Sequence, residues 1–565
     1  MVIMRRIQDI VKSHSLMLMK AMFALGVTLM VACGEDPITG GGEGEEDGPT
    51  PSTPTPTPPP SEQVSEVVNW MDKRLKKEYY WMDEYNKEHS KFDLSLEWNE
   101  FLDKTLMSLT TNMDDGSKNA SGQRTRLYTY VDRWETTKSD ATRASLPKVS
   151  GYGIELSSYV VRVAGITEEY GDDDYGFVVE HAYPGSAAAE AGIRRGDVIL
   201  KIDGKKITES TFGDLWMNTL SATSGSMTLS LRMFNDEAEE YEFKDVEITA
   251  SRYEHNPVAY SGVLSVDKEY YDIGDKKIGY LSYLAFDSDF NEALVSAFKE
   301  LSSQGVTDMI LDLRANGGGH VDASVMLASM LLDESYVGED KIYARLKHNP
   351  KNEVYEDQDI TLSKKYVPDG STSETDLPNL SIQKLWVICS EWSASASEMV
   401  IVGLRGLDVE VTLVGNKTEG KNCGMEVTTE IFDGFEYEFA PITFMNENGK
   451  GFSDYGDGII PETHLAEKAN DKSLKENLRE MCSYYPIPLT VWGDTESDVA
   501  LVETVKQICG STLFKASSAQ AFSPRQMTTR SGGSAMPQRS ALKVEREDLA
   551  SRGLIVREGD FEYTK

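Results

Sequence analysis

The stretch Glu391–Met425, EWSASASEMVIVGLRGLDVEVTLVGNKTEGKNCGM, decides the fold and the chemistry that we expect from this chain. It begins with alternating serines and alanines, continues with apolar residues at helical spacing, and then becomes rich in β-branched residues. This order predicts a helix and then a strand. Ser395 lies at the start of the predicted helix, and Lys421 follows the predicted strand. A hydroxyl and an amine in these places form the pair that a serine–lysine nucleophile needs.

The residues on both sides of this stretch alternate between strand and helix patterns. Apolar runs predict strands at 278–281, 308–313 and 385–389, and helical spacing predicts helices at 290–301 and 321–332. This alternation predicts an α/β core with a mixed, partly parallel sheet over residues 251–490. Open sheets of this kind place their sites at the carboxyl ends of the strands.

A glycine-rich turn, DLRANGGG at residues 312–319, follows one of these predicted strands. Backbone N–H groups exposed in such a turn can bind a phosphate or stabilise an oxyanion. The spacing matches neither a Walker motif nor a dinucleotide motif, which disfavours phosphate. We interpret Asp312 and Arg314 as a structural charge pair near the strand end.

A second pattern lies in residues 184–204, PGSAAAEAGIRRGDVILKIDG, and it resembles a PDZ domain. The resemblance implies a β-rich domain at residues 148–250. It also implies that Gly151, Tyr152, Gly153 and Ile154 form a carboxylate-binding loop, beside which an extended peptide adds a strand. A scaffold domain without a ligand is the alternative.

Three ordered motifs in the core, LDLRANGGG, WSASASEMV and VGNKTEGKN, resemble the S41 family of C-terminal processing peptidases, which also carry a PDZ domain. The resemblance covers about residues 151–462. It implies that Ser395 is the nucleophile and Lys421 the general base. It implies that the oxyanion donors are the amide of Gly317 or Gly318 and the amide of Ala396. The partners would be peptides or unfolded proteins, and the reaction would need no metal and no ATP.

Lysine serves as a base only when it is neutral, so we expect Lys421 to be buried with its pKa lowered. Members of the family often place a glutamine four residues after the lysine to orient its amine, whereas this chain has Met425. Asn422 or Glu426 are candidate substitutes. The same departure motivates a second hypothesis, a catalytically weak or inactive lipoprotein that binds peptides.

Other residues near the motifs offer alternative chemistry. Ser395 and Glu398 fit a capping-box pattern, so we interpret Glu398 as a structural cap. His320 offers a rival serine–histidine arrangement with Asp312 or Asp322. Cys423 is an alternative nucleophile, although no histidine lies close by in sequence. The cysteines fit no zinc pattern, and we expect structural thiols, with one disulfide possible: Cys389, Cys423, Cys482 and Cys509.

The N-terminus carries a targeting pattern. Basic residues precede the apolar run Ala21–Ala32, which is too short to span a bilayer and predicts a secretory signal at residues 1–33. Cys33 directly follows, as in a bacterial lipobox, so we expect it to be lipidated; ordinary signal cleavage is the alternative. Residues 34–62, rich in Gly/Glu and then Thr/Pro, predict a tether. We therefore expect a cell-envelope protein, lipid-anchored to the outer membrane on its periplasmic or outer face.

The whole composition limits the remaining choices. A chain of 565 residues is too long for one core. We expect a small helical domain at residues 63–147, and a helix at Val499–Cys509 within a C-terminal segment at residues 491–565. The net charge of −36 argues against nucleic-acid binding, because phosphate contacts need clustered Lys and Arg.

Overall fold

The computed structural model describes residues 65–119, 121–135, 148–164, 166–235, 240–268, 271–474, 479, 482–483, 485–486, 490–509, 538–543 and 554–556. The predicted signal peptide, Cys33 and the tether lie outside the described residues. Within the described ranges, no helix combines the length and the apolar character that crossing a membrane would require.

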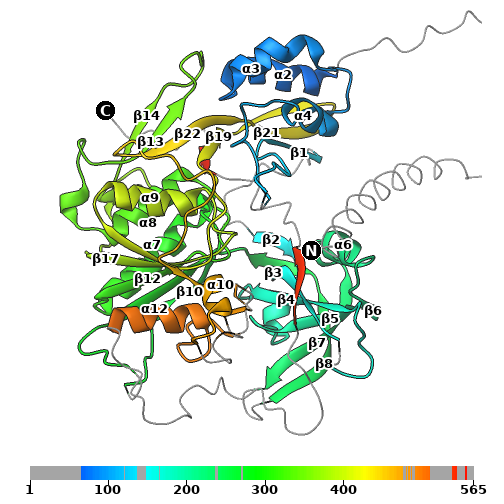
Figure 1. Ribbon diagram of the computed structural model, residues 1–565, viewed down its shortest axis with the longest axis vertical. Helices are drawn as coiled ribbons and strands as arrows, with labels where there is room; N and C mark the ends of the chain where they lie inside the picture. The colour runs from blue at the N-terminus through cyan, green and yellow to red at the C-terminus, as the bar shows by residue number, and fades with distance from the viewer. Residues whose placement is uncertain are drawn as a thin grey trace, which may run out of the picture. The chain divides into compact units, whose positions relative to one another are not determined.

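A six-stranded sheet forms the centre of the α/β core (Figure 1). Its order is β10 (Val258–Val263), β11 (Ile278–Tyr283), β12 (Asp308–Asp312), β17 (Lys384–Cys389), β18 (Glu410–Gly415) and β23 (Thr463–His464). The pairs from β11 to β23 are parallel, whereas β10 pairs with β11 in the antiparallel sense. The predicted mixed, partly parallel sheet is confirmed.

Helices cover both faces of this sheet, which explains why its strands are apolar throughout. On one face, Leu311 and Val387 pack among the helices α7 (Asn291–Ser303), α8 (Val321–Leu331) and α9 (Ala396–Gly406). On the other face, Ile310 and Ile388 pack against α10 (Leu465–Asn470) and the C-terminal helix α12 (Val499–Cys509), which begins and ends where the sequence predicts (Figure 1).

A second sheet contains the strand that follows Lys421 in the chain. Its order is β14 (Gln358–Thr361), β13 (Ile342–His348), β22 (Ile442–Asn448), β19 (Cys423–Glu426) and β25 (Leu554–Val556). The short strand β25 comes from the C-terminal segment and pairs in parallel with β19. A small ladder of β15 (Lys365–Tyr366) and β16 (Thr375–Asp376) lies between β14 and β17 in sequence.

The N-terminal region contains the helices α2 (Glu66–Glu78), α3 (Met82–Glu88) and α4 (Trp98–Leu106). It also contains β1 (Tyr130–Glu135), which the helical pattern did not predict. This strand pairs with β21 (Phe435–Ala440), whose other neighbour is β20 (Thr428–Phe432). Leu75 and Tyr79 share one hydrophobic cluster with Cys423, Met425 and Phe439. The core of this region is therefore continuous with the residues that follow Lys421.

The β-rich region after it has a hydrophobic core of its own. Its main sheet has the order β24 (Gln538–Lys543), β3 (Ile154–Arg162), β4 (Tyr175–Ala182), β5 (Val198–Ile202), β7 (Ser226–Asn235) and β8 (Glu240–Thr249), with β6 (Lys205–Lys206) beside β5. A separate pair joins β2 (Lys148–Gly151) to β9 (Ser251–Glu254). The helical elements are α5 (Ala187–Glu190), α6 (Phe212–Asp214) and the turn Leu215–Leu220.

A buried arginine ties this β-rich region to the core. The Arg195 guanidinium lies 3.3 Å from Glu180 of the same region, and it donates to the carbonyl of Thr490 at 2.5 Å. It also covers the Trp492 ring, 3.7 Å from its centre. Asp498, at the start of α12, lies 3.9 Å from Arg195 and 2.8 Å from Arg314. Buried charges are costly unless they are paired, so this network fixes the contact.

Candidate active site

Ser395 occupies a strained turn between β17 and α9. It is the residue before the first helical residue, with φ 60° and ψ −111°, a conformation that costs energy for a residue with a side chain. The neighbouring serines hold the turn in place, because Ser393 Oγ donates to Leu313 O at 2.8 Å and Ser397 Oγ donates to Asn316 O at 3.0 Å. Ser395 Oγ is buried and has no hydrogen-bonding partner among the described residues. The hydroxyl predicted as nucleophile is thus the one that the turn leaves unpaired.

The glycine-rich turn after β12 lies directly against this serine. Gly318 has φ +109°, and a Cβ placed there would lie 2.8 Å from Ser395 Cβ and 2.9 Å from Ala394 O. No side chain fits at these distances, so this position requires a glycine. Asn316 anchors the turn, because its Nδ2 donates to Tyr283 O at 2.9 Å. The structure therefore brings the first two predicted motifs into contact.

The amides predicted as oxyanion donors differ in whether they already donate a hydrogen bond within the protein. Ala396 is the first residue of α9. An N–H group in this place has no acceptor within the helix and lies at the positive end of the helix dipole. The Gly318 amide instead donates to Asn316 Oδ1 at 2.8 Å, so it is held within its own turn. The oxyanion roles of Gly317, Gly318 and Ala396 stay a prediction.

Lys421 follows β18 and is completely buried. Its Nζ lies 4.4 Å from the centre of the Tyr128 ring. Burial is the main cause that lowers the pKa of this amine from its ordinary 10.5 to about 8; nearby Arg126 acts in the same direction, while Cys423, Asp115 and Glu419 oppose the shift. This is the burial and the direction of pKa change that the sequence led us to expect.

The carboxylate of Glu398 links the serine turn to the lysine loop. Its Oε2 accepts from the Ser395 amide at 2.9 Å and from the Lys421 amide at 2.8 Å. Its Oε1 accepts from Thr418 Oγ1 at 2.6 Å and from the Gly420 amide at 2.8 Å. Burial raises the pKa of Glu398 to about 7, although these hydrogen bonds favour the carboxylate. The predicted structural cap is confirmed in the bond from the Ser395 amide to Glu398, and the reach of Glu398 to the lysine loop is a further finding.

The rival nucleophile arrangements are not supported by the geometry. His320 Nδ1 accepts from the Ser288 amide at 3.0 Å, and Ser288 Oγ donates to Asp322 at 2.6 Å. Asp312 is hydrogen-bonded to Arg314 at 2.7 Å, so it forms the predicted structural pair instead of orienting His320.

The described cysteines are all free. Burial raises the pKa of the Cys423 thiol well above its ordinary value, so this residue stays a neutral thiol and a poor nucleophile.

The predicted carboxylate-binding loop lies between β2 and β3. Gly153 has φ +77°, and a Cβ there would lie 2.0 Å from Ser186 Cβ, so the loop is packed tightly against the start of α5. The carbonyls of Tyr152 and Gly153 accept from the amides of Ala188 and Tyr183, each at 3.0 Å. The outer edge of β3, to which a peptide would add, pairs with β24 of the chain's own C-terminal segment. The peptide-binding role of this loop stays a prediction.

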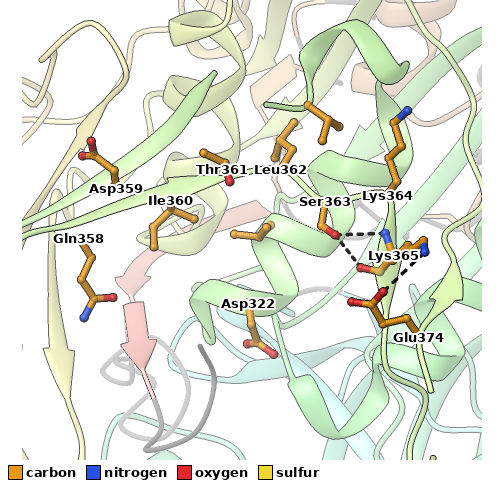
Figure 2. A pocket seen from close by; sticks show the side chains of 12 residues that line it. Asp322, Gln358, Asp359, Ile360, Thr361, Leu362, Ser363, Lys364, Lys365 and Glu374 are labelled. Atoms are coloured by element: carbon orange, nitrogen blue, oxygen red, sulfur yellow. Dashed lines mark hydrogen bonds and ion pairs between the residues drawn. The ribbon is translucent and has the colours of Figure 1, made fainter. Parts of the chain in front are cut away.

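A separate cavity of about 700 Å³ lies between α8 and residues 358–365 (Figure 2). Asp322 and Val325 of α8 line it, together with Lys364, Lys365 and Glu374. Its charges are of both signs, and neither Ser395 nor Lys421 lines it. The cavity therefore gives no support to a substrate class.

The structure thus has two parts. One is a partly parallel α/β sheet with a buried serine and a buried lysine beyond its strand ends, and the other is a β-rich domain. Comparison with protein families identifies both parts. Residues 277–465 match the model of peptidase family S41, and residues 178–215 match that of a PDZ domain. Residues of the α/β core are therefore similar to the S41 peptidase family, and those of the β-rich region are similar to a PDZ domain.

Curated relatives and a solved structure agree with this assignment. The chain is 26% identical over 301 residues to a "Probable CtpA-like serine protease" of Staphylococcus aureus (strain N315), covering 53% of this chain and 52% of that protein. A protein of the same description from Staphylococcus haemolyticus (strain JCSC1435) is 26% identical over 302 residues, covering 54% and 52%. The chain spans about half the length of these relatives. The crystal structure of a protein described as an S41 protease, from Bacteroides fragilis NCTC 9343, has a TM-score of 0.55 at 22% identity, covers 78% of this chain and 97% of that one, and supports the fold.

Proposed function

We propose that this chain is a serine-type endopeptidase in which Ser395 is the nucleophile and Lys421 is the general base. One observation carries the proposal: the Glu398 carboxylate accepts from the backbone amides of both Ser395, whose hydroxyl is buried and unpaired, and Lys421, which is fully buried with its pKa lowered to about 8. With that pKa, roughly a tenth of the lysine is neutral at pH 7, against about one part in three thousand for an ordinary lysine.

The reaction follows from these positions. Ser395 Oγ attacks the peptide carbonyl carbon, and its proton passes to the neutral Lys421 Nζ. The Ala396 amide and an amide of the glycine-rich turn stabilise the oxyanion, each contributing about 3 kcal/mol. When the C–N bond breaks, the leaving amine takes the proton from Lys421. Water then hydrolyses the acyl-serine ester, with Lys421 again accepting a proton.

The PDZ domain supplies a reason for a peptide to arrive. We propose that the loop at residues 151–154 binds a terminal carboxylate and that the peptide pairs with the edge of β3. Peptides or unfolded proteins with a free C-terminus are the substrates that this chemistry selects. Export and lipid anchoring through Cys33 would place the reaction in the cell envelope. If so, Cys33→Ser removes fatty-acid labelling and membrane association; labelling that persists in this variant contradicts the anchor.

A peptide-binding lipoprotein with weak or no catalysis is the second candidate. The observation that favours it is the Gly318 amide, which is held by Asn316 Oδ1 instead of being available to an oxyanion. Met425, in the position of an orienting glutamine, points the same way.

Turnover of casein and of tagged peptides by the full-length chain separates the two candidates. We expect cleavage by the wild type, no effect of EDTA, and a loss on the order of 10⁴-fold or more in Ser395→Ala and in Lys421→Ala. Peptide binding by Ser395→Ala controls for folding. Turnover that survives in Ser395→Ala would overturn the nucleophile. Peptide binding without any wild-type turnover would favour the binding protein.

A further inference from the structure

The orienting group of Lys421 is the open question of this site. Met425 lies on β19, is completely buried, and packs in the hydrophobic cluster shared with the N-terminal helices. Of the candidate substitutes, Asn422 donates through Nδ2 to Ser453 O at 2.9 Å, and the Glu426 carboxylate lies 3.9 Å from His348. A residue from another part of the chain also contacts the amine.

Tyr128 lies against the lysine from the N-terminal region, just before β1. The lysine Nζ lies 4.4 Å from the centre of the Tyr128 ring, and both side chains are buried. An ammonium over the face of an aromatic ring is attracted by the ring quadrupole. That attraction favours the charged amine, but the ring also occupies space that water would otherwise take, and the exclusion of water outweighs the attraction because burial is the largest influence on the Lys421 pKa.

Hydrogen bonds hold Tyr128 at its side-chain hydroxyl and at its backbone amide. Its hydroxyl donates to Glu419 Oε1 at 3.0 Å, two residues before Lys421, and its amide donates to Asp115 Oδ1 at 3.1 Å. Ser117 also donates to the Glu419 carboxylate. The Glu419 amide in turn donates to Ser393 O, at 3.1 Å, within the serine turn. The ring is thus fixed with respect to both the lysine loop and the nucleophile.

We propose that Tyr128 is the positioning residue of Lys421: its ring seals and aligns the amine in place of a glutamine at position 425. The inference rests on the proposed peptidase function. It also gives the N-terminal region a role in the reaction, since Ser117 and Tyr128 contact the lysine loop instead of belonging to a separate cap.

Two substitutions separate the ring from the hydroxyl. Tyr128→Phe keeps the ring and loses only the hydroxyl with its bonds to Glu419 and Ser117, so we expect kcat within about threefold of the wild type. Tyr128→Leu removes the ring, and we expect kcat to fall about 10²-fold with KM nearly unchanged, as for a misplaced catalytic group. Because water then reaches the amine, the pH midpoint of kcat/KM should rise from about 8 towards the ordinary lysine value.

Tyr79→Leu is the matched control. Tyr79 is completely buried and donates to the same Asp115, at 2.7 Å. Its loss should destabilise the region as much as the loss of Tyr128, while the pH midpoint stays near 8. If Tyr128→Leu shows the same kcat and the same midpoint as Tyr79→Leu, the role of Tyr128 is structural only and the proposal is wrong.

A titration that needs no activity distinguishes this proposal from the peptidase function. In the full-length Ser395→Ala protein labelled with ¹⁵N-lysine, the Lys421 signal is assigned by its absence in Lys421→Met. We expect a midpoint near 8, and a higher midpoint when Tyr128→Leu is added. Equal midpoints would overturn the proposal even if the enzyme is active. Different midpoints in a protein without turnover would uphold it while the peptidase function fails.

Discussion

At the residue scale, the proposed chemistry depends on a lysine that the fold keeps from water. Lys421 has no exposed surface, and its neutral form is favoured by burial more than by any single neighbour. A base of this kind works only above its pKa, because the protonated amine cannot accept the serine proton. The depressed pKa therefore sets the range of pH in which the site is active.

This residue predicts a single acid-side limb in the pH profile. The value of kcat/KM should rise with pH through a midpoint near 8, falling about tenfold per pH unit below it. Steady-state rates on one peptide between pH 6 and 10 measure this limb. Tyr128→Phe serves as a control that keeps the midpoint. A rate that is constant from pH 6 to pH 9 would contradict the lysine base.

We expect the substitution of Gly318 by alanine to lower kcat strongly, although it adds only one methyl group. In Gly318→Ala the new Cβ would lie 2.8 Å from Ser395 Cβ, so the nucleophile or its turn must move. We expect kcat to fall on the order of 10²-fold.

Gly274→Ala is the control for this substitution, because it imposes the same kind of positive φ with no atom within 4 Å. It should lower stability by about 1 kcal/mol without changing kcat. Equal kcat values in the two variants would show that Gly318 does not support the serine.

Single residues also mark the limit of what the sequence can predict. Ser395, Lys421 and the Glu398 cap follow from motifs in one short stretch, and the structure gives them the expected burial and contacts. Tyr128 has no motif, and almost three hundred residues separate it from the lysine in the chain. Spacing along the chain reports only on neighbours in one helix or strand, so a contact formed by tertiary packing leaves no local signal.

At the scale of elements, strands buried on both faces could be predicted from their apolar runs, and their order along the chain suggested parallel pairing. The strand β1 could not be predicted, because its partner β21 lies about three hundred residues away in the chain. Apolar spacing does not mark where α4 starts, because Leu94 and Leu96 continue the apolar pattern before its first residue, Trp98.

The start of α12 carries a prediction about stability. Asp498 is buried, and although burial alone would raise its pKa, Arg314 and Arg195 hold the pKa below its ordinary value. Asp498→Ala would leave buried Arg314 with Asp312 alone and buried Arg195 with Glu180 alone, which costs on the order of 3 kcal/mol in the free energy of unfolding. Urea denaturation at pH 7 measures this loss.

The Asp498 carboxylate also predicts the direction in which stability changes with pH. A depressed carboxyl pKa stabilises the fold above the ordinary value of 3.8, and that stability is lost as the pH falls through the folded-state pKa. Asp498→Ala should flatten this part of the acid dependence. Glu410→Ala, which breaks the exposed pair with Lys384, should cost less than about 1 kcal/mol. Equal losses in the two variants would contradict the role of the buried network.

At the scale of the whole molecule, the site is assembled from distant parts of the chain. The N-terminal region supplies Tyr128, the core supplies the serine and the lysine, and Arg195 of the PDZ domain joins the charge network beside the glycine-rich turn. The predicted boundaries divide the chain where the sequence pattern changes. They do not show that the N-terminal helices share their core with residues after Lys421, because shared burial is a property of the assembled fold.

The C-terminal segment predicts an effect on peptide binding. Because β24 pairs with the outer edge of β3, a peptide that adds to this edge must displace it. Truncation after residue 537 should therefore tighten the binding of a labelled C-terminal peptide, measured by fluorescence anisotropy in the Ser395→Ala background.

Arg539→Pro, within β24 and opposite Val161 of β3, should have part of the same effect, because proline removes a backbone donor from the strand. A proline at Ser531, upstream of β24, is the control and should leave affinity unchanged. An unchanged Kd after truncation would show that the PDZ domain takes peptides at another place.

The central claim is that Lys421 activates Ser395, and covalent labelling tests it most directly. The full-length chain is treated with a fluorophosphonate, which reacts with activated serine hydroxyls, and the modified residue is located by peptide mass spectrometry. The account predicts one adduct, on Ser395, forming at a rate that rises with pH through about 8 and lost in Lys421→Met. An adduct on another residue, or labelling of Ser395 at an unchanged rate in Lys421→Met, would contradict it.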